Sequence, residues 1–399
     1  MRNIIKRDGT VRPYEPEKII TAMGKAFRET AAGTSREEME RLLRAVEKEM
    51  EHKDGGWAVE DIQDAVERVL MENGRYEEAK RYILYRHRRN EQRAARRAMA
   101  QAAGVPALDG VLAKIEKDFP GEAYALTVLN TKFQSFVKPG MGADAALEAL
   151  VKAAVELTSQ EAPRWEFIAA RLLNARFGRS LEEQLRKRGI GGLYDKLRRL
   201  TDEGLYGEYI LAHYSREEIE QAQNFLRPER DELFTYSGLD LLLKRYVIHD
   251  RAHAPLETPQ EMFLGIALHL AMLEKNDRLE WVRRFYDMLS TPTVTMATPT
   301  LSNARKPYHQ LSSCFIDTVP DSLDGIYRSI DSFAKVSKFG GGMGLYFGKV
   351  RAAGSAIRGF KGAAGGVIRW IKLANDTAVA VDQLGVRQGA VAVSLDAWH

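Results

Sequence analysis

The residue of this chain best suited to chemistry is its single cysteine, Cys314. It lies in a short apolar run, residues 311–316, that is typical of a β-strand. The next segment, Asp321-Ser322-Leu323, predicts the first turn of a helix, because Asp and Ser side chains accept hydrogen bonds from free helical N–H groups. A thiol on a strand that leads into a helix N-terminus fits a catalytic site. It equally fits a buried structural cysteine, since free cysteines are among the most buried residues.

Nucleophilic catalysis and metal binding have weaker support. Ser313 and His309 lie close to Cys314 in the sequence, but a cysteine–histidine pair needs a third group to orient it, and no neighbouring residue supplies one. His249 and His253 have the i, i+4 spacing of metal ligands, without the glutamate arrangement of a metallohydrolase. We therefore predict no metal site.

Two glycine-rich segments match phosphate-binding loops only in part. Residues 339–348 contain no GxGxxG motif at the required spacing, and they precede a predicted strand instead of following one. Residues 354–359 begin like a P-loop, but Phe360 stands where that loop requires a lysine. Neither segment indicates a nucleotide site by itself.

Positive charge gathers in the N-terminal part of the chain. Lys6 and Arg7 precede Asp8-Gly9, a dipeptide typical of β-hairpins. Further along, residues 80–97 hold eight lysines and arginines against one acid, Glu91. A basic helix of this kind could contact a triphosphate or nucleic acid, or it could simply be a solvated face.

The first half of the chain must position these cations mainly with helices. A hairpin within residues 2–12 is followed by predicted helices at 16–28, 35–50, 59–72 and 76–97, separated by a break at 52–57 and by Asn73-Gly74. Ser35 to Glu38 has the sequence of a capping box. From 98 to 190 the pattern is helical: Asp144 predicts the cap of a helix to about 157, Pro163 the start of one to about 177, and Ser180 a further capping box.

The second half changes from helices to an alternation of strands and helices. Helices are predicted at 193–202, 215–224 and 258–274, the last beginning with Thr258-Pro259-Gln260-Glu261, a complete capping box. From residue 289 we predict strands at 294–296, 312–317, 344–347 and 390–395, and helices at 322–337 and 367–381. Such alternation favours an α/β sheet or barrel with its sites at strand ends.

Composition excludes several classes of protein. The 399 residues, 45% hydrophobic and 29% charged, describe a globular protein of two or three domains with a mild net charge of +4. No apolar run is long enough for a transmembrane helix, and residues 1–8 lack the apolar core of a signal peptide. A single cysteine allows no internal disulfide, so we expect a cytoplasmic location. The abrupt stop at 396–399 suggests a fragment of a longer protein.

Six motifs follow one another between Thr298 and Ala390. They are Thr298-Pro299-Thr300-x-Ser302-Asn303, Ser312-Ser313-Cys314, Asp321-Ser322-Leu323-Asp324, the glycine run 340–344, the Arg351-containing segment 350–359, and Gln383-x-Gly385-x-Arg387-x-Gly389-Ala390. In this order and spacing they closely resemble the first strands of the catalytic barrel of ribonucleotide reductase large subunits. Phe234-Thr235-Tyr236-Ser237 is similar to the entry segment of that barrel.

The N-terminal module carries a second resemblance. Residues 4–9, Lys18, and Ala79-x-x-Tyr82 are similar to the ATP-cone, a regulatory module that precedes the barrel in many ribonucleotide reductases. The resemblance implies that Lys6, Arg7 and Lys18 contact the phosphates of ATP or dATP, and clustered cations suit a triphosphate. Val59 and Gln63 stand where some members have Thr and His. Residues 98–190 weakly echo the cone without its basic hairpin, which suggests a degenerate second cone with a packing and linking role.

The resemblance also assigns roles around the thiol. Reduction of the ribose 2′-carbon takes two electrons, which two thiols supply by forming a disulfide, and Cys314 matches the first of them. Thr298, Ser313 and Arg387 match residues that bind the substrate. The residues that match the specificity site, where a deoxynucleoside triphosphate selects the substrate, are Asp321, Ser322, Leu323, Arg351, Ile357 and Gln383.

The family's reaction needs parts that these residues lack: an Asn-x-Cys-x-Glu element, whose cysteine forms the thiyl radical, and a second reducing thiol. We therefore expect turnover of a ribonucleoside diphosphate only together with the remaining half of the large subunit. The resemblance further implies a small radical-generating subunit, a thioredoxin- or glutaredoxin-type reductant, and a homodimer, with no nucleic-acid or membrane partner. Two alternatives remain open: an adenosylcobalamin-dependent reductase, and a non-catalytic fragment that senses ATP, dATP and other nucleotides.

The predicted fold combines α+β and α/β parts. Residues 1–97 form an ATP-cone, a β-hairpin plus helices. Residues 98–190 form the helical linking region. Residues 191–399 form the first part of a ten-stranded α/β barrel.

Overall fold

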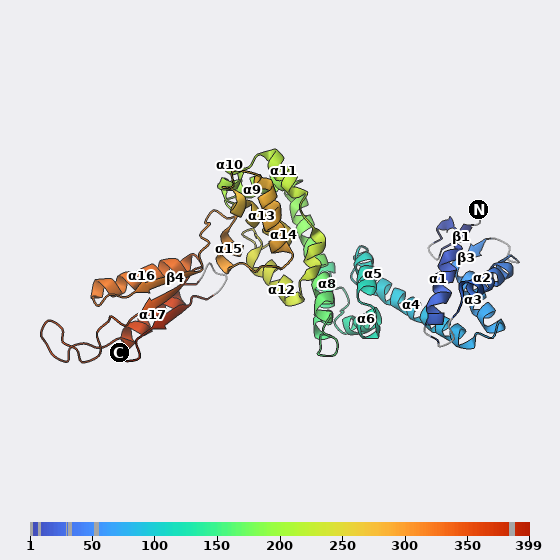
Figure 1. Cartoon of the computed structure of the whole chain (residues 1–399), viewed down its shortest axis with the longest axis horizontal. Helices are drawn as coiled ribbons and strands as arrows, with labels where there is room; N and C mark the ends of the chain where they lie inside the picture. Colours follow the sequence, from blue (N-terminus) through green and yellow to red (C-terminus); the bar gives the residue numbers. More distant parts are fainter. Residues whose placement is uncertain (1–2, 7–8, 29, 31–33, 52–55, 383–387) are drawn as a thin grey trace. The chain divides into compact units, whose positions relative to one another are not determined.

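The computed structural model of the chain describes residues 3–6, 9–28, 30, 34–51, 56–382 and 388–399. The chain divides into two compact units, residues 1–137 and 138–399 (Figure 1). Within the described ranges, no helix is both long enough and apolar enough to cross a bilayer.

The N-terminal unit begins with a small sheet in the order β2-β1-β3. Strand β1 (Asn3–Ile5) pairs antiparallel with β2 (Val11–Pro13), which confirms the predicted hairpin. The third strand, β3 (Trp57–Ala58), pairs parallel with β1. Strand β3 begins within the predicted break at 52–57. It was not predicted, because a two-residue strand is too short to show a periodic pattern in the sequence.

Four helices pack beside this sheet with apolar stripes that alternate with charged faces, as their sequences predict. In α2, Ser35 Oγ accepts a hydrogen bond from the Glu38 N–H at 3.2 Å. Only this half of the predicted capping box forms, because the Glu38 carboxylate pairs with Arg75. Helix α4 continues five residues beyond the predicted end at 97. The helices are α1 (Pro16–Arg28), α2 (Arg36–Met50), α3 (Val59–Glu72) and α4 (Tyr76–Ala102).

Helix α4 also supports the last part of this unit. Two helices joined by a segment with a short 3-10 turn pack on it, and Leu112, Ile115, Leu129 and Phe133 are completely buried there. These elements are α5 (Leu108–Asp118), η1 (Glu122–Tyr124) and α6 (Leu126–Gln134).

The second unit opens with a long helical region. Helix α8 (Trp165–Lys187) passes through Ser180 without a break, so the predicted capping box there is wrong. Buried Phe177 and Leu181 continue one apolar stripe across that site, and packing overrides the local signal. Helix α7 (Ala143–Glu156) begins after Gly142, and Asp144 pairs with Arg176 instead of capping the helix.

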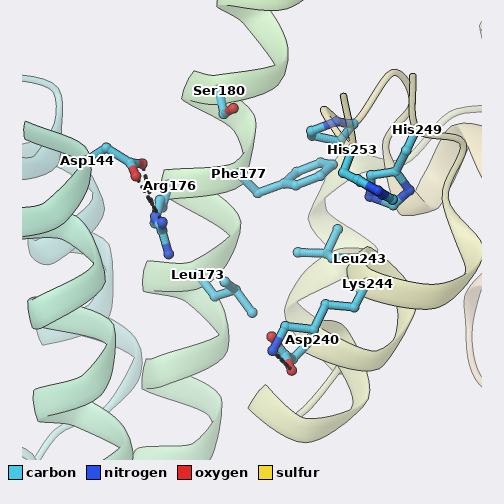
Figure 2. Close-up of a pocket in the computed structure, with 11 residues that line it drawn as sticks. Asp144, Leu173, Arg176, Phe177, Ser180, Asp240, Leu243, Lys244, His249 and His253 are labelled. Carbon is cyan, nitrogen blue, oxygen red and sulfur yellow. Dashed lines mark hydrogen bonds and ion pairs between the residues drawn. The ribbon is translucent and has the colours of Figure 1, made fainter. Parts of the chain in front are cut away.

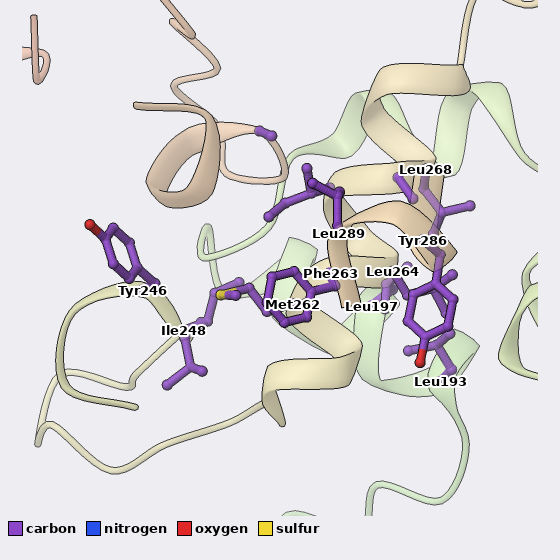
Figure 3. Close-up of a cluster of buried hydrophobic side chains, with 14 of the residues drawn as sticks. Leu193, Leu197, Tyr246, Ile248, Met262, Phe263, Leu264, Leu268, Tyr286 and Leu289 are labelled. Atoms are coloured by element: carbon purple, nitrogen blue, oxygen red, sulfur yellow. The ribbon is translucent and has the colours of Figure 1, made fainter. Parts of the chain in front are cut away.

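The remaining helices of this region surround a hydrophobic core. Figure 3 shows part of it, with Leu193, Leu197 and Leu264 close to Tyr286, and with Met262 beside Phe263 and Ile248. The predicted capping boxes at Ser215 and Thr258 are both present, and the second helix ends at 271 instead of 274. The elements are α9 (Leu193–Asp202), α10 (Glu208–His213), α11 (Arg216–Gln223), η2 (Pro228–Leu233), α12 (Tyr236–Leu241), the π-helical turn η3 (Leu242–Tyr246), α13 (Pro259–Ala271), α14 (Arg278–Ser290) and α15 (Thr298–Asn303).

A buried ion pair joins three of these elements. The Arg305 side chain is fully buried, and its Nε lies 3.0 and 3.1 Å from the two carboxylate oxygens of Glu257. It also donates to the carbonyl oxygens of Leu301 in α15 and Tyr246 in η3, both at 2.8 Å. Arg305 therefore fixes α15 against η3 and the approach to α13.

The C-terminal part is a parallel three-stranded sheet, in the order β4-β5-β6, packed against two helices (Figure 1). The predicted strand at 294–296 is wrong, because that segment is irregular and the following Thr and Pro residues start α15. The predicted strands and helices after residue 311 are confirmed, and each end agrees to within two residues. They are β4 (Cys314–Thr318), α16 (Leu323–Lys338), β5 (Gly342–Tyr346), α17 (Ile368–Ala380) and β6 (Val391–Ser394).

Candidate functional site

The N-terminal unit contains a cavity of 790 Å³ between the hairpin, α1, α3 and α4, which we call the cone pocket. Its lining contains five cationic side chains and one carboxylate, Glu15. Lys6 and Lys18 are the two described members of the predicted phosphate-binding set, and both line it. The third, Arg7, lies outside the described residues. The cationic residues are Lys6, Arg12, Lys18, Arg89 and Arg93.

Three of these cations were missed when sites were assigned from the sequence. Arg12 lies on β2, and Arg89 and Arg93 are one helical turn apart on α4. The i, i+4 spacing of the two α4 residues inside the basic segment 80–97 was the available signal. This positive lining suits a ligand with several negative charges, such as a triphosphate.

Apart from Glu15, the rest of the cone-pocket lining is apolar or neutral. Val59 and Gln63, the two departures from the family pattern, both line it. Tyr82 does too, and burial, followed by the nearby Glu67 charge, raises the pKa of its phenol to about 12. These residues therefore offer neutral hydrogen-bonding groups beside apolar surface, which suits a nucleoside.

In the second unit, Cys314 is the first residue of β4, and its thiol is exposed. Sγ lies 3.5 Å from Ser313 Oγ. The alternation of β4 puts Cys314 and Ile316 on the open face of the sheet, opposite the face that α16 and α17 cover. This position differs from that of the buried structural cysteine that the sequence also allowed.

Glycines on the neighbouring strand leave space beside the sulfur. Gly342 is paired with Cys314 and Gly344 with Ile316, so β5 presents no side chain on this part of the open face. Next to them, a Cβ on Gly341 would come within 2.7 Å of Phe315 and Val336 side chains. The glycine run thus leaves this part of the open face of β5 without side chains and allows close packing against Phe315 and Val336.

Thr298 and Ser313, the two described residues predicted to bind the substrate, lie in different segments, and of the two only Ser313 has a contact with Cys314 among those described. Thr298 is the first residue of α15, where its Oγ1 lies 3.4 Å from the Tyr246 hydroxyl. Ser313 directly precedes β4, and its carbonyl oxygen accepts a hydrogen bond from Gly342 N–H at 2.8 Å. The predicted substrate residue Arg387 and the predicted effector residue Gln383 lie outside the described residues.

The other end of β4 leads to a cavity of 550 Å³, which we call the effector pocket. It brings together all five described residues that we predicted for a specificity site, from two separate segments of the sequence, 321–323 and 350–359. Arg358, Gly366 and Trp370 also line it, and none of the three was assigned to this site from the sequence. The predicted residues are Asp321, Ser322, Leu323, Arg351 and Ile357.

One ion pair organises the effector pocket. Arg351 donates from its backbone N–H to Asp321 Oδ1 at 3.2 Å and from Nε to Oδ2 at 2.8 Å. Its Nη1 donates to the Ala356 carbonyl at 3.0 Å, so the arginine fixes the loop that carries Ile357. Ser322 caps α16 by accepting from the Gly325 N–H at 3.1 Å. Cations and a helix N-terminus at one cavity favour an anionic ligand.

A further cavity of 440 Å³ lies in the helical region, between α8 and the segment 240–255 (Figure 2). His249 and His253 line it together, with the ion pairs Asp144–Arg176 and Asp240–Lys244 also drawn in Figure 2. Within the described part of the chain, no group of three or more His, Cys, Asp and Glu residues is arranged to hold a metal ion.

Three family profiles match separate parts of the chain. They are the ATP cone domain at residues 2–91, the ribonucleotide reductase all-alpha domain at 232–309 and the ribonucleotide reductase barrel domain at 312–399. The ribonucleoside-diphosphate reductase subunit alpha of Treponema pallidum is 58% identical over the whole chain. The chain belongs to the ribonucleotide reductase large-subunit family.

Other members of the ribonucleotide reductase family are more distant. The subunit alpha of Chlamydia muridarum is 34% identical over the whole chain, and that of Escherichia coli is 33% identical over 63% of it. The chain spans 48% of the Treponema protein, 41% of the Chlamydia protein and 33% of the Escherichia coli protein. In this ribonucleotide reductase chain, the cone pocket lies in the ATP-cone, and Cys314 and the effector pocket lie in the barrel domain.

Proposed function

We propose that this chain is the N-terminal part of a ribonucleoside-diphosphate reductase large subunit, and that it carries one reducing thiol and two regulatory nucleotide sites. The main support is the arrangement of β4. Its exposed thiol lies at one end, and the effector pocket begins three residues beyond the other end. At a rise of about 3.3 Å per residue, the two ends are about 13 Å apart. A nucleotide in the effector pocket therefore lies close to a substrate bound at Cys314.

The chemistry assigns Cys314 to one half of a redox pair. Replacement of the 2′-hydroxyl by hydrogen consumes two electrons and two protons, releases water, and converts two thiols to a disulfide. The 399 residues contain one cysteine, so the second thiol comes from another polypeptide segment. Thr298 and Ser313 hold the substrate by hydrogen bonds, and the glycines opposite Cys314 leave room for its ribose.

The two cavities have separate regulatory roles in this proposal. ATP or dATP occupies the cone pocket, with its phosphates at Lys6, Arg7 and Lys18. A deoxynucleoside triphosphate occupies the effector pocket, with Asp321, Ser322, Leu323, Arg351 and Ile357 around it. The family resemblance adds Gln383 to the effector site and Arg387 to the substrate site. Both ligands are anions and both cavities contain cationic side chains, and this charge complementarity supports both assignments.

The assembly completes what this chain lacks. The residues that correspond to the rest of the relatives supply the radical cysteine and the acid/base glutamate. A small subunit generates the radical, a thioredoxin- or glutaredoxin-type protein reduces the disulfide, and two copies of the large subunit associate. Assignment to the cytoplasm follows from the thiol chemistry, since reduced thiols persist there.

Reconstitution tests the redox assignment. The chain is combined with a polypeptide that matches the remaining part of its relatives and with their small subunit, and the reduction of a ribonucleoside diphosphate is measured. Cys314→Ser should abolish multiple turnover, because serine cannot form the disulfide. Thr318→Ser, at the far end of the same strand face, is the matched control and should keep activity. A fully active Cys314→Ser enzyme would refute the assignment.

A further inference from the structure

Arg89 lines two cavities of the N-terminal unit. One is the cone pocket. The other, of 480 Å³, lies between α4 and the segment 116–128, and we call it the α5 cavity. Arg89 is therefore placed between the nucleotide site of the proposed function and the helices that follow the cone.

The Arg89 guanidinium is bound on the α5 side. Its Nη1 donates to Glu116 Oε1 at 2.7 Å, and the Glu116 side chain is only 13% exposed. Glu116 Oε2 also accepts from Arg96 Nη1 at a longer 3.4 Å, while Arg96 Nε pairs with Asp109 at 2.6 Å. Glu116 thus joins α5 to α4, with Arg89 as its closer partner.

A nucleoside triphosphate in the cone pocket would compete for the same guanidinium. Lys6, Arg12, Lys18 and Arg93 attract an anion into the cone pocket, whose lining also contains Arg89. The bound anion would in turn attract the Arg89 guanidinium. A guanidinium binds phosphate by paired, charge-assisted hydrogen bonds, which are stronger than the single hydrogen bond of an ion pair whose arginine is 45% exposed. The Arg89 side chain is 45% exposed, so packing restrains it only in part.

We propose that triphosphate binding transfers Arg89 from Glu116 to the phosphates, so that nucleotide binding and the α4–α5 ion pair oppose each other. This inference rests on the proposed function of the cone pocket and adds the route by which occupancy acts on residues 108–134. Because coupling is reciprocal, the Glu116 carboxylate lowers nucleotide affinity by the same factor by which nucleotide weakens its ion pair. Release of Glu116 loosens the C-terminal turn of α5 and the α5 cavity.

A pair of charge-neutralising variants tests the competition. Glu116→Gln releases Arg89 and should lower the Kd for ATP by about two- to five-fold, the range expected for a partly exposed ion pair. Glu122→Gln is the matched control. Glu122 pairs with Arg88 at 2.9 Å, and Arg88 lines the α5 cavity but is absent from the lining of the cone pocket. Both variants remove one negative charge near α4. Calorimetric titration with ATP therefore separates the competition for Arg89 from the general electrostatic effect of losing a negative charge.

Hydrogen exchange provides the second measurement. In the wild-type chain, ATP should increase amide exchange in residues 115–119, and this increase should be absent in Glu116→Gln, where the ion pair is already broken. Arg89→Gln should bind ATP more weakly and should also show no increase. Equal Kd values for Glu116→Gln and Glu122→Gln, or an unchanged exchange rate at 115–119 in wild type, would overturn the inference while the nucleotide site stands. No ATP binding to the wild-type chain would overturn the site itself.

Discussion

Replacement of Arg305 by methionine should destabilise the second unit by about 3–5 kcal/mol, because it leaves the buried Glu257 carboxylate without its cation. Both side chains are almost completely buried, at 0% and 3% exposure. Glu257 would keep one donor, the Ile248 N–H at 2.8 Å. The carbonyl oxygens of Leu301 and Tyr246 would lose their partners at the same time.

A double-mutant cycle separates the ion pair from these backbone contacts. Arg305→Met and Glu257→Met each leave one buried charge, so each should cost about 3–5 kcal/mol. The double variant leaves no charge but still orphans three backbone groups, two carbonyls and one N–H, at about 1 kcal/mol each. Its total cost should therefore be about 3 kcal/mol, far below the sum of the single variants.

The assay is urea unfolding followed by tryptophan fluorescence, with the free energy of unfolding taken by linear extrapolation. Arg283→Met is the matched control. Its ion pairs with Glu280 and Asp287 involve a side chain that is 47% exposed, so it should cost less than about 0.5 kcal/mol. If Arg305→Met costs no more than this control, or if the two single effects add, the ion pair does not hold α15 in the way described.

Three further predictions concern binding, pH and packing. Changing Lys6 and Lys18 together to Ala should weaken ATP binding by about ten-fold or more while leaving dTTP binding unchanged, since each charged hydrogen bond contributes about 1.5–3 kcal/mol; equal losses for both ligands by calorimetry would contradict the two-site arrangement. Burial raises the pKa of Asp231 from 3.8 to about 6, so wild-type stability should fall as pH rises from about 4 to about 6, and Asp231→Asn should be more stable by up to about 3 kcal/mol at pH 7 but not at pH 4. Urea midpoints at the two pH values test this, and a difference independent of pH would count against it. Gly265→Ala should cost about 1–3 kcal/mol, because its Cβ would lie 2.7 Å from Arg305 Cδ and closer still to the Tyr206 hydroxyl; thermal unfolding at or above the wild-type midpoint would show that the packing yields.

Local signals in the sequence predicted the fold well wherever a segment is amphipathic or capped. The helix at Thr258 begins as its capping box predicts, and the strand that carries Cys314 begins two residues after its predicted start. Errors occurred where tertiary packing decides. The Ser180 sequence could start a helix, but Phe177 and Leu181 on both sides of it are buried in one continuous helix, and this stabilises the uninterrupted form more than a cap would.

The candidate sites were predictable in part, because their residues belong to recognisable motifs. Asp321, Arg351 and Ile357 were predicted to meet, and they line one cavity. The contribution of Arg89 required the three-dimensional structure. The i, i+4 spacing of Arg89 and Arg93 puts both residues on one face of α4, but it does not tell whether that face lines a cavity or meets solvent.

The three-stranded order β4-β5-β6 leaves the outer strands each hydrogen-bonded on one side only, among the residues described. Unpaired backbone N–H and C=O groups at the edge of a sheet can form hydrogen bonds with a further strand of the same sheet or with a strand of a neighbouring molecule. Ile316, on the outer strand β4, is 88% exposed and adds an apolar side chain that favours association. Purification of these residues in isolation should therefore yield concentration-dependent aggregates, and co-expression with strands that continue the sheet should keep them in solution.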